Sequence, residues 1–248
     1  MTTTTTTTTT PTTFPATAAH AATARRSGAD ISARLTGAAA LGFGATVVAQ
    51  NIIRGGAAPA NDAPATEVLT HYADHRALTF VLVSTFVVGG LSLATFLGGA
   101  ARQMLTSVRR GWAITGVVGA VGVLGLFAVL VSSEEALSVM AGRDQPDVSA
   151  IEAVWTLHNS IFTVLLLSIA VALLGLSRGG VAAGITPRVF DRLAPIGSGL
   201  LVVGTLAGPA IAAGENMAFF GVSVVGFAVW LAFLSTTGVR LVRSAGAR

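Results

Sequence analysis

The chain has 248 residues, of which 52% are hydrophobic and 10% are charged, and its mean hydropathy is +0.75. Because a soluble domain has about 25% charged residues, this composition excludes an ordinary soluble protein and indicates one embedded in a membrane. The net charge of +4 comes without a basic stripe interleaved with aromatic residues, so nucleic acid is not an expected partner.

The amino-terminal segment, residues 1–32, is rich in threonine and alanine. Such low-complexity sequence cannot bury enough apolar surface to offset the entropy of ordering, so we expect a disordered tail. An alternative for residues 25–60 is a secretory signal cleaved near Ala58 and Ala60. The length of the apolar run and the polar residues that precede this site favour an uncleaved first span.

Six uncharged runs of 19 to 25 residues follow one another along the chain. A helix needs about 20 apolar residues to cross the hydrocarbon core, so each run is long enough to cross once and too short to cross twice. The sequence therefore predicts an all-α, polytopic transmembrane six-helix bundle, with the lipid bilayer as its surroundings. Residues 33–243 form its single domain and residues 244–248 a short tail, with spans at about 33–53, 77–100, 112–132, 154–176, 194–213 and 217–238.

Arginine is distributed unequally between the connecting segments. The termini and the connections 2–3 and 4–5 together contain twelve of the fifteen basic residues, all of which are arginine, whereas the other side contains nine of the eleven acids. Arginine next to short loops resists translocation, so we expect both termini in the cytoplasm. The sequence therefore predicts a multi-pass membrane protein with its arginine-rich face on the cytoplasmic side.

Residues 61–76 have the pattern of a short amphipathic helix on the outer side, with Asp62 as its cap. One stripe is polar, and it contains a histidine pair four residues apart, His71 and His75. The opposite apolar stripe can rest on the membrane surface or on the ends of the spans. A solvated face is the simplest interpretation of the polar stripe.

Small residues inside the spans indicate close helix packing, because little hydrophobic driving force exists between helices in lipid. The third span has four glycines spaced three apart, from Gly116 to Gly125. They drift around half the helix, which predicts contact with more than one neighbour and a central position for this span. Glycine-rich spans are also candidates for contact with a second copy or a partner membrane protein. In the fifth span, Gly208 and Pro209 predict an interruption, interpreted as a packing bend.

The fourth span has a polar pair, His158 and Asn159, near its outer end. Ser149 and Glu152 before it have the spacing of a capping box. If the core ends near Leu176, counting back about 20 residues places the pair only about 2 to 5 Å beneath the outer boundary. Hydrogen bonding between helices is the default role of such shallow residues, and ligand binding is the alternative.

The polar candidates all fall at the outer ends of the spans, and the middles of the spans are almost free of them. This distribution does not favour a proton or ion path, which needs ionisable groups at the midplane. It favours a non-enzymatic binding, transport-associated or accessory protein with an outer polar pocket. Its candidate binding residues are His71, His75, Glu134, Glu135, His158, Asn159 and Glu215.

Enzyme signatures are absent from the sequence. It has no Gly-x-Ser-x-Gly elbow, His-Glu-x-x-His motif, phosphate loop or dinucleotide fingerprint, and the lack of cysteine excludes thiolate sites and cysteine nucleophiles. No catalytic residue and no cofactor is therefore predicted. The alternative class is a membrane enzyme or metalloprotein with zinc or copper held by His71, His75 and His158.

Four segments of the chain, taken together with their order and spacing, resemble a known group of membrane proteins. They are "NDAPATEVLTHYADHRALTFVLV", "IEAVWTLHNSIFTVLL", "ITPRVFDRLAPIGSGLLVVG" and the final "RLVRS". Over about residues 30 to 245 the chain resembles six-span integral membrane proteins of actinobacteria that are grouped under domains of unknown function. The resemblance implies a bacterial source and a six-helix fold in the cytoplasmic membrane of the bacterium. It implies no activity and no site residues.

Overall fold

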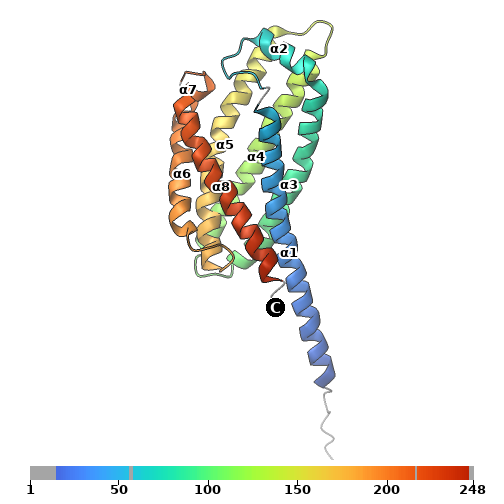
Figure 1. Cartoon of the computed structure of the whole chain (residues 1–248), viewed down its shortest axis with the longest axis vertical. Helices are drawn as coiled ribbons and strands as arrows, with labels where there is room; N and C mark the ends of the chain where they lie inside the picture. The colour runs from blue at the N-terminus through green and yellow to red at the C-terminus, as the bar shows by residue number, and fades with distance from the viewer. Residues whose placement is uncertain (1–14, 56–57, 216, 246–248) are drawn as a thin grey trace, which may run out of the picture.

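The computed structural model describes residues 15–55, 58–215 and 217–245, with side chains from Asp30 onward. Every regular element within these residues is an α-helix, and long helices run side by side along the molecule (Figure 1). The helices are α1 Pro15–Arg54, α2 Ala65–Asp74, α3 Arg76–Met104, α4 Arg110–Ala141, α5 Val148–Ala182, α6 Phe190–Leu206, α7 Gly208–Ala212 and α8 Met217–Ser244.

Five helices in the described part of the chain are long and apolar enough to cross a membrane: Asp30–Arg54 of α1, and α3, α4, α5 and α8. Five of the six predicted spans lie within them. The predicted span 194–213 is divided, because α6 ends at Leu206 and α7 begins at Gly208. Pro209 lies in the first turn of α7 and has no N–H to continue the helix of α6, so the predicted interruption is confirmed.

The central helix is α5, whereas the sequence predicts α4. In its most apolar stretch 56% of the residues are buried, against 28% to 33% in the other four spans. A Cβ on Gly116 or Gly119 would collide with the α5 backbone, and one on Gly122 would lie 2.9 Å from Ser168 of α5. Because Gly125 faces open space, the glycine row meets one neighbour rather than several.

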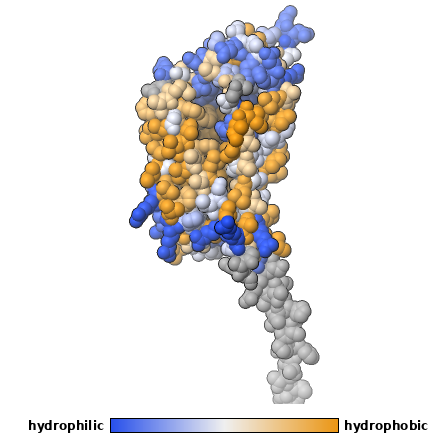
Figure 2. Space-filling view, viewed as in Figure 1, coloured by the Kyte–Doolittle hydropathy of each residue, from blue (hydrophilic) through white to orange (hydrophobic). Residues whose placement is uncertain are grey.

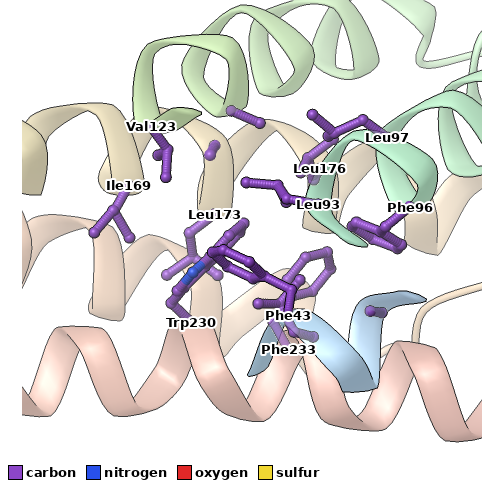
Figure 3. Packing of buried hydrophobic residues seen from close by; sticks show 14 of the residues in the cluster. Phe43, Leu93, Phe96, Leu97, Val123, Ile169, Leu173, Leu176, Trp230 and Phe233 are labelled. Atoms are coloured by element: carbon purple, nitrogen blue, oxygen red, sulfur yellow. The ribbon is translucent and has the colours of Figure 1, made fainter. Parts of the chain in front are cut away.

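Apolar side chains from α1, α3, α4, α5 and α8 interlock in the main core. Trp230 and Phe233 of α8 stack with ring centroids 5.6 Å apart, and they lie beside Phe43 and Leu173 (Figure 3). This core fixes the relative positions of the helices that surround the site described below.

A second core closes the end of the bundle at α2. Val68 and Tyr72 are buried there against Leu137 of α4 and against Ile151 and Trp155 of α5. The apolar stripe of α2 thus packs on the ends of α4 and α5. The predicted cap at Asp62 is wrong, because Pro64 precedes the helix and no side chain caps it.

Two other helix starts differ from the sequence prediction. Asp147 caps α5 and accepts hydrogen bonds from the N–H groups of Ser149 and Ala150, so the predicted capping box of Ser149 and Glu152 does not form. Because α5 begins at Val148, Asp147 occupies the N-cap position, whereas Ser149 already lies in the first turn and its own N–H needs an acceptor. Helix α1 begins at Pro15, within the segment predicted to be disordered, and the many alanines of this segment favour a helix. Residues 1–14 lie outside the described residues.

The two ends of the bundle are hydrophilic and the belt between them is hydrophobic (Figure 2). At the end opposite α2, the guanidinium of Arg178 lies 4.6 Å from the centre of the Trp112 ring. Near this end α1 and α8 cross in close contact, since a Cβ on Gly37 would lie 2.6 Å from the Gly238 carbonyl oxygen. From this crossing the two helices diverge toward the α2 end (Figure 1).

Candidate functional site

A cavity of about 230 Å³ lies in the half of the bundle nearer to α2, and we call it the central cavity. Helices α1 and α8 form its front, where they diverge, and α4 and α5 form its back (Figure 1). The visible surface of the molecule is recessed in this region (Figure 2). Its lining consists of Phe43, Val47, Asn51, Arg54, Val123, Phe127, Leu130, Glu134, His158, Phe162, Leu165, Leu166, Ile169, Phe220, Ser223, Val224, Phe227 and Trp230.

The lining is apolar along most of the cavity and polar toward the α2 end. On α5 the lining begins at His158 and continues to Ile169, a distance of about 16 Å along the helix. On α1 the polar residues Asn51 and Arg54 are likewise the last to line the cavity before the helix ends. The cavity therefore has the polarity of an amphiphile, with one polar end and a long apolar body.

An ion pair closes the polar end of the cavity. Arg54 Nη2 donates to Glu134 Oε2 at 2.6 Å, and the side chains are only 21% and 9% exposed. Removing two charges from water costs several kcal/mol per ion, and their attraction only partly offsets this. The pair therefore contributes little net stability, which indicates that it has a further role.

A smaller cavity of about 40 Å³ lies on the other side of the ion pair, and we call it the α2 cavity. Arg54 and Glu134 line both cavities, so their side chains form the partition between them. His71, Tyr72 and His75 of the α2 region line the smaller cavity only. The partition therefore separates a small cavity lined by His71 and His75 from a larger one whose walls are mostly apolar.

His158 is held in a fixed orientation beside the partition. Its Nδ1 lies 2.9 Å from Ser133 Oγ of α4, and its ring stacks on Trp155 with centroids 5.2 Å apart and planes 9° apart. The Trp155 indole is itself fixed, because Nε1 donates to the Asn61 carbonyl at 3.2 Å. The imidazole is therefore constrained both by its ring face and by one ring nitrogen.

Asn159 has a different environment from its neighbour. It is buried, and its Nδ2 donates to the Asn61 carbonyl at 3.0 Å. The Asn61 side chain in turn donates to the Ile211 carbonyl of α7 at 2.8 Å. Asn159 thus fastens the loop before α2 to α5, which agrees with the default hydrogen-bonding role, although its partner is a loop rather than a helix.

Two side chains that line the α2 cavity, His71 and Tyr72, have pKa values shifted toward their neutral forms. Burial lowers the pKa of His71 below its ordinary 6.5, the positive charge of His75 lowers it further, and Asp74 partly opposes both effects. The rings of His71 and His75 are stacked, with centroids 4.6 Å apart. Burial also raises the pKa of Tyr72, and the Glu134 carboxylate adds to this effect.

The structure brings some of the predicted site residues together and leaves others apart. His71, His75, Glu134 and His158 lie in the walls of the two adjoining cavities. Glu135 points to the exposed side of α4, and Glu215 is exposed in the turn after α7. Neither of these two carboxylates lines either cavity.

The three histidines of the alternative metal site do not form a ligand set. Among the described residues, no group of three or more His, Cys, Asp or Glu side chains is arranged to hold a metal ion. His158 lines the central cavity, whereas His71 and His75 line the α2 cavity beyond the partition. Spacing along α2 cannot reveal this separation.

Sequence reasoning missed two polar members of the site, Arg54 and Ser133. A signal for Arg54 exists, since it is one of the few arginines on the side rich in acids and stands at a span end, as Glu134 does. Ser133 gives no such signal, because a serine in a helix usually bonds to its own helix backbone, as Ser133 also does at the Leu130 carbonyl oxygen. The apolar body of the cavity depends on the divergence of α1 and α8, which no local pattern records.

Comparison of the chain with protein-family models, with characterised proteins and with solved structures gives no match.

Proposed function

We propose that this protein is a six-crossing protein of the bacterial cytoplasmic membrane that binds a single-chain amphiphile from the bilayer. The apolar chain occupies the central cavity, and the polar head lies at the partition of Arg54 and Glu134, beside His158. The protein acts as a non-enzymatic binding module, in transport or as an accessory to a partner. No step of the proposal requires a catalytic residue.

The proposed sixth crossing consists of α6 and α7 together. They run from Phe190 to Ala212, which is about 34 Å at 1.5 Å per residue and enough to cross the core. An even number of crossings fits the position of the start of α1 and the end of α8 at the same end of the bundle (Figure 1). Arg102, Arg109 and Arg188 favour the cytoplasm for that end, so in this proposal α2 lies outside.

The observation that supports amphiphile binding is the shape and polarity of the central cavity. A cavity of about 150 Å³ lined by Leu, Ile and Phe binds benzene, and this one measures about 230 Å³. Its volume extends along about 16 Å of α5, which leaves room for one chain and not for two side by side. The front lies between two helices that face the surrounding lipid, so a ligand enters sideways from the bilayer.

A fluorescence experiment tests binding, because Trp230 lines the central cavity. The full chain in lipid nanodiscs is titrated with 12-bromododecan-1-ol, whose bromine quenches tryptophan on contact. Quenching through the bulk lipid is not saturable, whereas occupation of one cavity is. We expect a saturable component that disappears in Trp230→Phe.

A matched pair of variants locates the binding. Val123 is 3% exposed and lines the cavity, whereas Val121, two residues earlier on α4, is 58% exposed and does not. Val123→Phe fills the cavity and removes saturable quenching, and Val121→Phe preserves it. Equal quenching curves for the two variants, or no saturable component in the wild type, would overturn the proposal.

Labelling of single cysteines tests the topology separately, since the chain has no native cysteine. A membrane-impermeant maleimide applied to intact spheroplasts should label Ala73→Cys on α2. It should label Thr106→Cys, in the connection after α3, only after the membrane is permeabilised. The opposite pattern would reverse the proposed orientation.

A further inference from the structure

We propose that the amphiphile has a neutral hydroxyl head that donates a hydrogen bond to Nε2 of His158. This inference deepens the proposed function and rests on it, because it assigns the chemical class of the ligand in the same cavity. It makes the ligand a single-chain alcohol rather than a fatty acid anion, an amine or an ether.

The tautomer of His158 follows from its contact with Ser133. A serine hydroxyl has one proton to donate, and Ser133 directs it to the Leu130 carbonyl oxygen at 2.6 Å. The contact of 2.9 Å between Ser133 Oγ and His158 Nδ1 must therefore use a proton on Nδ1. In a neutral imidazole the lone pair is then on Nε2, which is an acceptor.

Nε2 is the nitrogen that remains for a ligand. Its ring lines the central cavity. The polar neighbours of the ring on α4 are the Ser133 hydroxyl, which contacts Nδ1, and the Leu130 carbonyl oxygen, which can only accept, so neither donates a hydrogen bond to Nε2. The stacking of the ring on Trp155 and the bond through Nδ1 keep the imidazole from turning its other nitrogen toward the cavity. The polar end of the cavity thus presents a preorganised acceptor.

The partition argues against a charged head. The Glu134 carboxylate lies 2.6 Å from the Arg54 guanidinium and balances its charge, so the net charge at the polar end of the cavity is close to zero. An anionic head would have to displace Glu134 and leave that carboxylate buried without a partner, and a cationic head would displace Arg54 in the same way. Both exchanges leave an unpaired buried charge, which is strongly unfavourable. A neutral donor makes its bond to His158 and leaves the ion pair intact.

Two probes that differ only in the head test this assignment. The first is 12-bromododecan-1-ol, and the second is its methyl ether, which has the same chain and bromine but no proton to donate. Because one hydrogen bond is at stake, we expect the alcohol to saturate Trp230 quenching at a concentration about 3- to 10-fold lower than the ether. In His158→Phe, whose ring can still stack on Trp155, the two probes should quench equally.

Nitrogen NMR of the wild-type protein, labelled with ¹⁵N at histidine and held in nanodiscs, gives a second readout. It does not depend on whether a variant folds. The four histidines give separate ring signals, and the His158 ring should show a protonated Nδ1 and a bare Nε2. Addition of the alcohol should shift the Nε2 signal, whereas the ether should not.

The outcomes separate the two proposals. Saturable quenching with equal affinities, or with the ether bound more tightly, overturns the hydroxyl assignment and leaves amphiphile binding standing. A proton on Nε2 in the NMR spectrum overturns the assignment in the same way. Absence of saturable quenching by either probe means that the proposed function itself has failed, and this inference fails with it.

Discussion

Arg54 and Glu134 join two helices that are not otherwise neighbours. Arg54 ends α1 and Glu134 lies in the last third of α4, and their side chains meet at 2.6 Å. Within the described residues no Cα atom of α1 lies within 8 Å of one in α4. The ion pair therefore spans the space between these helices and closes the central cavity at its polar end.

Breaking this pair should be costly, and removing it whole should be much less so. Glu134→Leu leaves the Arg54 guanidinium buried without a partner, which we expect to cost about 3 to 5 kcal/mol in the free energy of unfolding. In the double variant Arg54→Met, Glu134→Leu no charge remains to be compensated, so most of this loss should be recovered. Chemical unfolding of the protein in mixed micelles, followed by circular dichroism, measures both.

Glu135→Leu is the matched control, because this neighbouring carboxylate is exposed and has no ion pair among the described residues. It should change stability by less than about 0.5 kcal/mol. Equal losses for Glu134→Leu and Glu135→Leu would contradict the role given to the ion pair.

The environment of His71 predicts a loss of stability in mild acid. Its pKa in the folded protein lies below the ordinary 6.5, because of burial and of the charge of His75. Between the folded pKa and 6.5 the unfolded chain binds more protons, so folding stability rises with pH there. The full contribution is present above about pH 6.5 and is lost as the pH falls through 6.5 toward the folded pKa.

A series of melting temperatures between pH 7.5 and 5 checks this expectation. His71→Asn removes the titrating group, so the variant should have a flatter profile over that range than the wild type. An unchanged profile would show that the destabilisation arises from other groups.

The sequence was sufficient to predict most of the helices, because crossing a bilayer demands long uncharged runs. The interruption of the span 194–213 at Pro209 was also predictable, because proline has no N–H to continue a helix. The choice of the central helix failed, since the Cβ positions of Gly116 and Gly119 show that α4 packs closely on α5 instead of occupying the centre. Spacing alone gives the direction of a glycine row but not the identity of the neighbour.

The candidate site was predictable only in part. The position of Glu134 and His158 at the same ends of their spans predicted that they lie in one site, and both line the central cavity. The same reasoning included Glu135 and Glu215, because membrane side says nothing about the face of a helix on which a residue lies. The role of Arg54 could not be predicted, because it depends on an ion pair with Glu134 of α4, 80 residues away in the sequence.

The shared acceptor at Asn61 should make two substitutions non-additive. Asn159 and Trp155 both donate to the Asn61 carbonyl oxygen, at 3.0 and 3.2 Å. Asn159→Leu leaves the indole donor in place, so we expect a loss of about 1 kcal/mol. In Asn159→Leu, Trp155→Phe both donors are lost, and the double variant should cost about 1 to 3 kcal/mol more than the sum of the single ones. A double-mutant cycle of unfolding free energies tests this, and strict additivity would mean that the two bonds are independent.

The packing of α4 on α5 predicts opposite outcomes for two glycines on the same helix. A Cβ on Gly119 would meet the Ala172 backbone of α5, which cannot move aside as a flexible side chain does. Gly119→Ala should therefore separate the two helices and cost about 1 to 3 kcal/mol. Gly125, six residues later, has nothing within 4 Å of its Cβ position, so Gly125→Ala should be neutral or stabilise the helix by up to about 1 kcal/mol. Melting temperatures of the two variants in nanodiscs distinguish these effects, and a loss of stability in Gly125→Ala as large as in Gly119→Ala would contradict close contact at Gly119 alone.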